Sequence, residues 1–254
     1  MAVARADIHF HLLPGVDDGP ASMEESVELA RAAALDGSRT IVATPHVRGD
    51  YVTDVDVLPE LVHSVREQVR RAGIGIEIRC GAEVGCDMVG RLGQADFEHL
   101  ALGPPGARWL LLETPFEGID AEVHAAIDEL HDRGFAVVLA HPERSADLLG
   151  EHEPALRHER ERERGTLVQV NALSLLGRHG PDAREAAAQL MLDGRADVIA
   201  SDAHSLAREP ALTAALEAAE ASGAPASAAR RLIDATPARL LARGIRAAPA
   251  RVPA

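Results

Sequence analysis

Aromatic residues are scarce in this chain of 254 residues, which has four Phe, one Trp and one Tyr. So few rings provide little material for the stacking platforms that bind single-stranded nucleic acid. Lysine is absent, so all 26 basic side chains are arginines, and 40 acidic residues bring the net charge to −14. A protein of this charge repels phosphate backbones. We therefore predict that it does not bind nucleic acid.

Cysteine is equally rare. Cys80 and Cys86 are the only two, they form no Cys-x-x-Cys motif, and they cannot build a framework of several disulfides. The sequence has no run of about 18 apolar residues that could cross a membrane, and no signal peptide precedes the first apolar segment. We expect a cytoplasmic protein without membrane insertion.

Apolar runs alternate with helical patterns along the chain. We predict strands at 6–10, 39–44, 75–81, 108–113, 136–140, 166–170 and 197–201, and helices at 23–36, 56–72, 120–133, 147–164, 182–194, 210–222 and 226–243. Apolar strands separated by helices form parallel sheets that helices cover on both faces. Seven such units favour a closed β/α barrel, as a single domain over residues 1–244 with a flexible tail at 245–254.

Residue types that bind metals follow the ends of these predicted strands. His9 and His11 are two residues apart, so both imidazoles point to the same side of a strand. The full set of candidate ligands is His9, His11, Asp18, His46, Glu83, Glu113, His141, Asp202 and His204. The carboxyl ends of barrel strands meet at one face, where active sites lie. Asp17 is hard to separate from Asp18 by pattern alone, because residues 15–19 also form a good turn.

Imidazoles mixed with carboxylates suit Mn, Fe or Zn, whereas Mg and Ca prefer oxygen ligands alone. Nine ligands are too many for one ion and about right for three. Paired ions about 4 Å apart activate water and stabilise the attacking and leaving oxygens of phosphoryl transfer. The set therefore predicts a phosphate-ester hydrolase that uses metal-activated water.

Arginine is the side chain expected to bind the substrate phosphate, because its fork matches phosphate oxygens. Arg144, three residues after His141, is the strongest candidate, and Arg208 is a second. For Arg48 a surface charge is the simpler interpretation. Four residues separate Cys86 from Arg91, so the chain lacks the Cys-x5-Arg loop of cysteine-dependent phosphatases, and no Ser-His-Asp set is evident.

The segments that carry these residues resemble the PHP (polymerase and histidinol phosphatase) superfamily, in particular the CpsB/CapC-type protein-tyrosine phosphatases of bacterial capsule and exopolysaccharide operons. The matching segments follow the family's order: DIHFHLLPGVDDG at 7–19, TIVATPH at 40–46, GAE at 81–83, LLE at 111–113, LAHPER at 139–144, QVNA at 169–172 and ASDAHS at 200–205. The resemblance implies a distorted seven-stranded (β/α)7 TIM-like barrel with a trinuclear centre. This centre is typically manganese-dependent, with Fe, Zn or Mg as other occupants.

The resemblance also implies a role for each residue. It assigns one ion to His9, His11, Glu83 and Asp202, a second to Glu83, Glu113 and His141, and a third to Asp18, His46 and His204. Asp17 is then the neighbour of a ligand in the turn. Arg144 and Arg208 would grip the phosphate, and this chain has Arg208-Glu209-Pro210 where the family usually has Arg-Pro-Pro. The implied substrate is a phosphotyrosine protein such as a bacterial tyrosine autokinase.

Three alternatives stay open beside this leading hypothesis. Another PHP phosphoesterase, acting on histidinol phosphate or a small molecule, usually carries a different His-containing segment in place of Asp17-Asp18-Gly19. A non-catalytic barrel scaffold is expected to have lost ligands, and this chain retains all nine. A metal-dependent amidohydrolase commonly uses a lysine at a strand end, which this sequence lacks.

Overall fold

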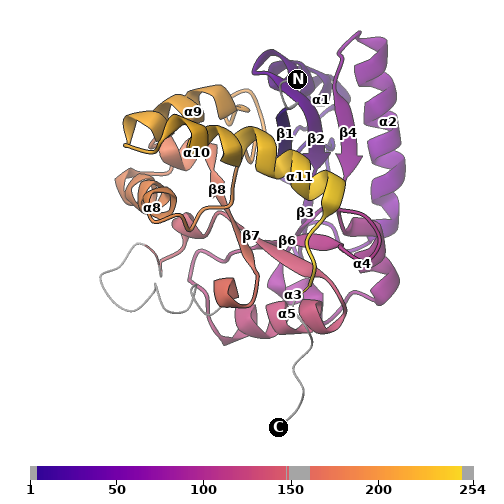
Figure 1. The fold of residues 1–254 in the computed structure, drawn as a ribbon. Helices are drawn as coiled ribbons and strands as arrows, with labels where there is room; N and C mark the ends of the chain where they lie inside the picture. The colour runs from indigo at the N-terminus through magenta and orange to yellow at the C-terminus, as the bar shows by residue number, and fades with distance from the viewer. Residues whose placement is uncertain (1–4, 147, 149–160, 248–254) are drawn as a thin grey trace.

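The computed structural model describes residues 5–146, 148 and 161–247, in which parallel strands alternate with helices (Figure 1). The strands are β1 (Arg5–Phe10), β2 (Ser38–Ala43), β3 (His46–Val47), β4 (Glu77–Cys80), β5 (Glu83–Val84), β6 (Trp109–Glu113), β7 (Ala136–Ala140), β8 (Leu167–Asn171) and β9 (Val198–Ala200). All seven predicted strands are present. The two short strands that the sequence did not predict, β3 and β5, continue β2 and β4 after a break of two residues each.

The strands are arranged in two sheets that follow one another around a ring. One sheet has the order β1-β2-β4, and the other has the order β3-β5-β6-β7-β8-β9. Pro45 lies in the break between β2 and β3, and it has no N–H to donate to a neighbouring strand. Gly81 nevertheless donates to Ala43, and Glu83 to Pro45, so backbone hydrogen bonds connect the two sheets across the breaks.

The ring closes between β1 and the loop after β9. Phe10 and Ala203 form an isolated parallel bridge. Asp202 N donates to His9 O at 3.0 Å, and His11 N donates to Ala203 O at 2.9 Å. The predicted distorted seven-stranded barrel is therefore confirmed, with β2/β3 and β4/β5 each counting as one interrupted strand.

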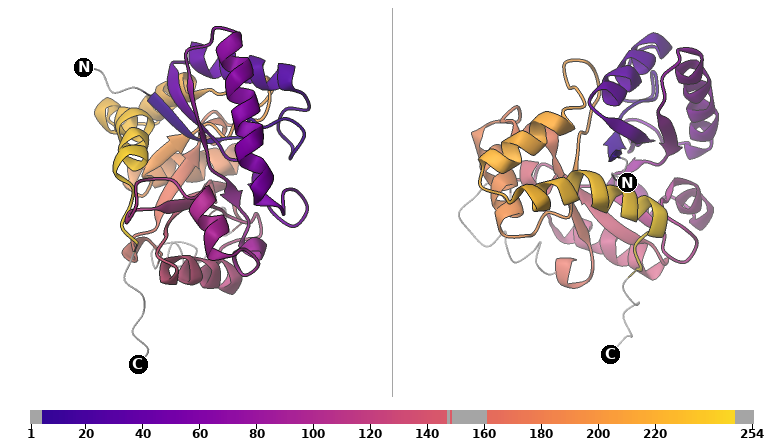
Figure 2. Two further views of the ribbon diagram at one scale, coloured as in Figure 1. Left: turned by 90° about the vertical axis from the view of Figure 1, so that its right-hand side faces the viewer. Right: turned by 45° about the horizontal axis from the view of Figure 1, so that its top comes forward.

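Helices surround the strands (Figures 1 and 2). The long ones are α1 (Met23–Leu35), α2 (Leu58–Arg71), α5 (Ala121–Asp132), α8 (Pro181–Leu192) and α9 (Leu212–Ala221). The predicted helix at 226–243 consists of α10 (Ala226–Arg230), a π-helical segment η3 (Arg231–Ala235) and α11 (Thr236–Arg243). The predicted helix at 147–164 falls mostly outside the described residues, although 161–163 are helical.

Several short elements escaped prediction because they are too short for a helical period. They are α3 (Cys86–Val89), α4 (Gln94–Leu100), η2 (Pro142–Arg144) and α7 (Ala172–Leu175), whereas η1 (Val55–Val57) overlaps the start of the predicted helix at 56–72. Two of the long helices, α1 and α5, begin with a side-chain cap, at Ser22 and Asp120. At the start of α1, Ser22 Oγ accepts from Glu25 N, and Glu25 Oε2 accepts from Ala21 N, so side chains satisfy two backbone N–H groups at this end of the helix. No helix in the described part of the chain has both the length and the apolar composition of a membrane span.

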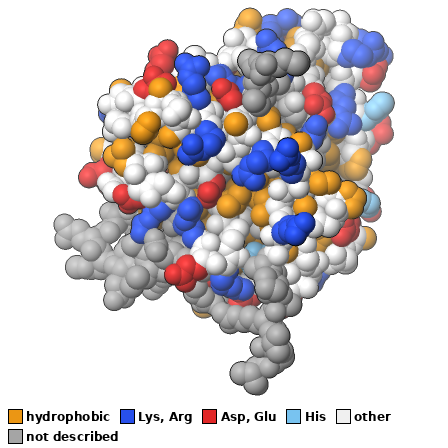
Figure 3. Space-filling view, in the orientation of Figure 1, with side chains coloured by type: hydrophobic (Ala, Val, Ile, Leu, Met, Phe, Trp, Pro, Cys, Tyr) orange, Lys and Arg blue, Asp and Glu red, His pale blue; other side chains and the backbone are white. Residues whose placement is uncertain are grey.

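The helix α11 covers the amino ends of the strands. Leu240 and Leu241 of α11 pack in one cluster with Ala6 and Ile8 of β1, and Trp109 Nε1, at the start of β6, donates to Leu240 O at 3.2 Å. The carboxyl ends of the strands are thereby left as the end of the barrel that can hold a site. Figure 3 shows arginine side chains gathered on the face that α11 crosses, despite the negative net charge.

The residues that follow α11 are attached to the barrel. Ile245 N donates to Ala107 O at 3.0 Å, and Ile245 and Ala247 pack against the same cluster as α11. The first residues of the predicted tail thus contact the barrel, and its flexibility stays a prediction. Residues 248–254 lie outside the described part of the chain, and the single-domain assignment stays a prediction.

Gly244 is a position at which close packing excludes any residue with a Cβ. It ends α11 with a φ of 66°, and a Cβ at this position would overlap the backbone carbonyl of Ala107. Backbone strain costs about 1–3 kcal/mol, and overpacking costs about as much again. Gly244→Ala should therefore lower the free energy of unfolding by about 3 kcal/mol, as measured by urea denaturation at fixed metal content.

Gly73 offers a matched control for this prediction. It has a φ of 70°, and open space surrounds the position where its Cβ would lie. Gly73→Ala should lower the free energy of unfolding by only about 1 kcal/mol, the cost of the left-handed conformation. Equal losses in the two variants would contradict the role of the Ala107 contact.

Candidate metal centre

The nine candidate ligands lie together at the carboxyl ends of the strands. They come from strand ends or from the loops that follow: His9 from β1, His11 directly after β1, Asp18 from the next loop, His46 from β3, Glu83 from β5, Glu113 from β6, His141 after β7, and Asp202 and His204 after β9. All except Asp18 are buried. The closest groups, with ligand atoms within 4.8 Å of one another, are His9-His11-Glu83-Asp202, His11-Asp18-His46-His204 and His46-Glu83-Glu113.

The first group has the dimensions of a metal site. His9 Nε2 and His11 Nε2 lie 3.2 Å apart. Glu83 Oε2 is 3.2 Å from the first nitrogen and 3.3 Å from the second, and Asp202 Oδ1 is 3.2 and 3.4 Å from them. A tetrahedral ion with bonds of about 2.0–2.1 Å holds its ligands about 3.3–3.4 Å apart. These four atoms therefore fit around one ion.

The other two groups match the implied ligand sets less closely. Asp18 Oδ1 is 3.1 Å from His204 Nε2 and 3.5 Å from His46 Nε2, as the third implied set requires. Glu113 groups instead with His46 and Glu83, and its Oε2 is 3.8 Å from His46 Nδ1. His141 Nε2 is 2.9 Å from Glu83 Oε1 but does not share a group with Glu113. The geometry thus joins His46 to both neighbouring groups.

Buried polar atoms support an ion at this place. Glu83 Oε2, His46 Nδ1 and His204 Nε2 are buried, and within the described residues they make no hydrogen bond. A buried polar atom without a partner costs free energy, so native structures normally provide one, such as a hydrogen bond, a water or an ion. The donor set, imidazoles mixed with carboxylates, fits ions such as Mn, Fe or Zn.

The electrostatics of the bare cluster lead to the same conclusion. Burial favours the neutral form of Glu83 and Asp202, yet the facing imidazoles hold the pKa of each carboxyl well below its usual range. Burial also opposes charge on His11, but the facing carboxylates of Asp17, Asp202 and Glu83 hold its pKa well above the ordinary value. Protons therefore balance the carboxylates in the absence of a metal, and metal binding would displace them.

Backbone strain is confined to the same site. His141 (φ 37°) and Asp202 (φ 53°) are the two non-glycine residues with positive φ in the described part of the chain. Such a conformation costs about 1–3 kcal/mol and persists only where surrounding contacts enforce it. His141 N donates to Gln169 O at 2.8 Å, and Asp202 N donates to His9 O at 3.0 Å. Neighbouring strands therefore hold both candidate ligands in place.

Asp17 has a larger role than that of a turn residue. Its Oδ2 lies 2.7 Å from His11 Nδ1 and accepts from His46 N at 3.0 Å, while its Oδ1 accepts from Gly19 N. A carboxylate on the second nitrogen of a metal-binding imidazole fixes the orientation and tautomer of the ring. Asp17 thus orients His11, whereas Asp18 faces the ligand group.

Two polar residues of β8 act in a similar way, and sequence reasoning missed them as site residues. Gln169 Oε1 is 2.9 Å from His9 Nδ1. Asn171 Nδ2 donates to Asp202 Oδ2 at 2.7 Å, and Asn171 Oδ1 accepts from Leu173 N. Gln169 and Asn171 are two residues apart at the end of β8. This placement was the sequence signal that could have identified them as site residues.

All three candidate arginines line one cavity of about 230 Å³ beside the candidate ligands. Arg144 Nη1 lies 3.2 Å from Asp202 Oδ2, and Arg208 Nη1 lies 2.8 Å from Asp18 Oδ2. Arg48 Nη1 donates to both oxygens of Glu113, at 2.8 and 3.0 Å. Arg48 Nε and Nη2 also donate to the exposed Asp50, at 2.9 and 2.7 Å, so this guanidinium links a surface carboxylate to a buried candidate ligand.

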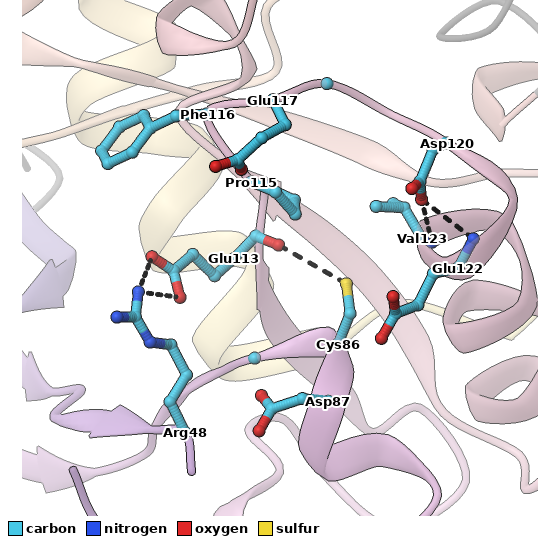
Figure 4. Close-up of a pocket in the computed structure, with 12 residues that line it drawn as sticks. Arg48, Cys86, Asp87, Glu113, Pro115, Phe116, Glu117, Asp120, Glu122 and Val123 are labelled. Atoms are coloured by element: carbon cyan, nitrogen blue, oxygen red, sulfur yellow. Dashed lines mark hydrogen bonds and ion pairs between the residues drawn. The ribbon is translucent and has the colours of Figure 1, made fainter. Parts of the chain in front are cut away.

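A second cavity of about 510 Å³ adjoins the first and shares Arg48, Glu113 and Phe116 with it (Figure 4). Cys86 lines this second cavity, and its Sγ is 3.8 Å from Glu113 O. Burial, together with nearby carboxylates, raises the pKa of the Cys86 thiol to about 12. The thiolate that nucleophilic catalysis requires is therefore disfavoured.

Comparison with known proteins identifies the family. The profile of the CpsB/CapC family, described as capsular polysaccharide synthesis, matches residues 5–242. The chain belongs to this family. It is 29% identical over 201 residues to the tyrosine-protein phosphatase YwqE of Bacillus subtilis, covering 79% of this chain and 77% of YwqE. It is also 29% identical over 212 residues to the tyrosine-protein phosphatase CpsB of Streptococcus pneumoniae, covering 80% and 84%.

Solved structures support the same assignment. The chain matches a structure from a study of YwqE and CpsB, described as metal-dependent tyrosine phosphatases, with a TM-score of 0.81, 28% identity and coverage of 98% and 100%. A more distant match is an organophosphorus hydrolase of Deinococcus radiodurans, with a TM-score of 0.57, 17% identity and coverage of 94% and 93%. The distant match shows only the shared barrel fold, which agrees with the predicted PHP-type architecture.

Asp17→Asn tests whether Asp17 orients a metal-binding imidazole. The amide keeps the size of the side chain but removes the charge that faces His11, so metal affinity should fall by about 10- to 100-fold. Calorimetric titration of the metal-free protein with Mn²⁺ measures this loss directly. Asp182→Asn, at an exposed position of α8, should bind like the wild type. Unchanged metal affinity in Asp17→Asn would show that Asp17 acts only in the turn and does not orient His11 for metal binding.

Proposed function

We propose that this protein is a metal-dependent protein-tyrosine phosphatase. The observation that carries the proposal is the cavity in which Arg48, Arg144 and Arg208 lie beside six of the nine candidate metal ligands. The names of the relatives YwqE and CpsB support phosphotyrosine as the target. The proposed substrate is a phosphotyrosine protein, such as a bacterial tyrosine kinase in capsule or exopolysaccharide production.

The metal ligands we propose are the nine clustered residues, with His9, His11, Glu83 and Asp202 as the best-formed set. Mn is the proposed resident metal, since the donors mix imidazole with carboxylate. When bound, the ions would activate a water molecule and neutralise charge on the transferring phosphoryl group.

The arginines are the side chains that would bind the substrate, in addition to the metal ions. Arg144 and Arg208 would bind phosphate oxygens in place of their present contacts with Asp202 and Asp18. A guanidinium offers two parallel donors to a phosphoryl group and stabilises the charge of its transition state. Arg48 holds Glu113 by two hydrogen bonds and so positions this carboxylate beside His46.

Removal of the metal tests the core of the proposal. Protein dialysed against EDTA should lose hydrolysis of p-nitrophenyl phosphate and of a phosphotyrosine peptide, and Mn²⁺ should restore both activities best. Elemental analysis should find metal in the active protein and little in the dialysed one. Full activity in excess chelator would refute a metal mechanism. Activity on small phosphate esters without activity on phosphotyrosine would favour the alternative PHP phosphoesterase.

Arg144→Ala tests the phosphate-binding role separately from metal binding. It should lower kcat/KM by about 100-fold, which corresponds to about 2.7 kcal/mol of transition-state binding. Metal content should stay at the wild-type value, whereas His141→Ala should lose metal as well as activity. Arg184→Ala, at an exposed position of α8, serves as the control for loss of one positive charge. Near-wild-type kinetics in Arg144→Ala would shift the role to Arg208 or Arg48.

A further inference from the structure

The six aromatic residues of the chain fall into two sets. Phe10, Phe97, Trp109 and Phe135 are almost completely buried in the core. Tyr51 and Phe116 are 38% and 53% exposed, and both line the cavity of about 230 Å³ that the three arginines share. Single exposed rings are ordinary, but grouped exposed apolar side chains indicate a binding surface. Both exposed rings of this chain therefore lie at the entrance to the candidate metal centre.

Tyr51 is held in place by residues of the site. Its ring stacks on the His46 ring, with centroids 5.2 Å apart and an angle of 13° between the planes. The Arg48 guanidinium carbon lies 5.4 Å from the Tyr51 ring centroid. Tyr51 N donates to Arg48 O at 3.1 Å, and Val52 N donates to His46 O at 3.3 Å. The loop therefore fixes this ring against a candidate ligand.

Phe116 occupies a corresponding position on another loop. It follows the end of β6 by three residues, and the Arg144 guanidinium carbon lies 4.8 Å from its ring centroid. Ala146 N donates to Phe116 O at 2.8 Å, so the loop is bonded to the segment after β7. Figure 4 shows the ring pointing away from Cys86 and Asp120, which line the second cavity.

We propose that Tyr51 and Phe116 determine substrate specificity by holding the phenyl ring of an aryl phosphate. The inference rests on the proposed function, because the phosphate of the same molecule must reach Arg144 and the metal centre. Each ring is backed by one of the cavity arginines, so ring binding and phosphate binding are coupled within one small space. Contacts between aromatic rings favour aryl over alkyl groups beyond simple burial. The site therefore prefers phosphotyrosine to phosphoserine and to other alkyl phosphates.

Two non-hydrolysable probes separate the ring from the phosphate. Phenylphosphonate and methylphosphonate carry the same head group, and only the first has a ring. Calorimetric titration of the Mn-loaded protein should show tighter binding of phenylphosphonate. In the double variant Tyr51→Ala with Phe116→Ala, this preference should fall by about tenfold, the order expected for the loss of two aromatic contacts. The affinity for methylphosphonate should stay within about twofold of wild type.

Matched variants exclude general damage to the site. Tyr51→Phe keeps the ring and should keep the preference, whereas Phe116→Leu keeps apolar bulk without a ring and should lose part of it. Leu35→Ala removes an exposed apolar side chain of α1, outside the cavity, and should leave both affinities unchanged.

The ratio of the two affinities decides the outcome. An equal preference for the phenyl probe in wild type and double variant overturns the inference, even if both affinities change, because the rings then serve the phosphate pocket alone. The absence of any preference in the wild type overturns it as well. Neither result depends on turnover, so a failure of the ring slot is distinguishable from a failure of the proposed phosphatase activity.

Discussion

One buried carboxylate is the centre on which the site depends. Glu83 is fully buried, and its two oxygens face four imidazoles, with Oε2 3.1–3.3 Å from nitrogens of His9, His11 and His46 and Oε1 2.9 Å from His141. A buried charge is costly unless it is paired or binds an ion. Glu83 is tolerated only because strands from separate parts of the barrel deliver positive or metal-binding partners around it.

This arrangement explains the irregular form of the barrel. Glu83 and His46 are the first residues of β5 and β3, the short strands that resume after each break. Their register pairs them directly. The breaks in β2 and β4 thus bring an imidazole and a carboxylate side by side at the mouth of the barrel. The helix α11 seals the opposite end, so packing and chemistry occupy different ends of the same strands.

The arginines around the cavity make two kinds of contact, with carboxylates and with aromatic rings. The arginines neutralise carboxylates of an acidic cluster, and the same guanidinium groups lie against the two exposed rings. Under the proposed function, a phosphate would compete with Asp18 and Asp202 for Arg208 and Arg144. A substrate that fits this cavity therefore needs an anionic group for the arginines and an aromatic ring for Tyr51 and Phe116. This double requirement links the proposed phosphatase activity to the proposed ring slot.

The sequence by itself determined the alternation of strands and helices, because apolar periodicity is a local property of the chain. It also indicated the candidate ligands, although the pattern alone could not separate Asp18 from Asp17. The carboxyl ends of parallel strands converge on one face, so placement at a strand end was enough to predict that residues such as His9 and Asp202 meet. The position of Arg144 at the site could be predicted for the same reason, since this residue follows β7 closely.

Only the tertiary structure decided how loop residues are used. Asp17 and Asp18 are adjacent in one turn, yet one orients His11 and the other faces His204 and Arg208, of which Arg208 is 190 residues away from Asp18. The role of Arg48 depends on Glu113, which is 65 residues distant. The path of a loop and the rotamers of its side chains are set by such distant contacts, which no local pattern contains.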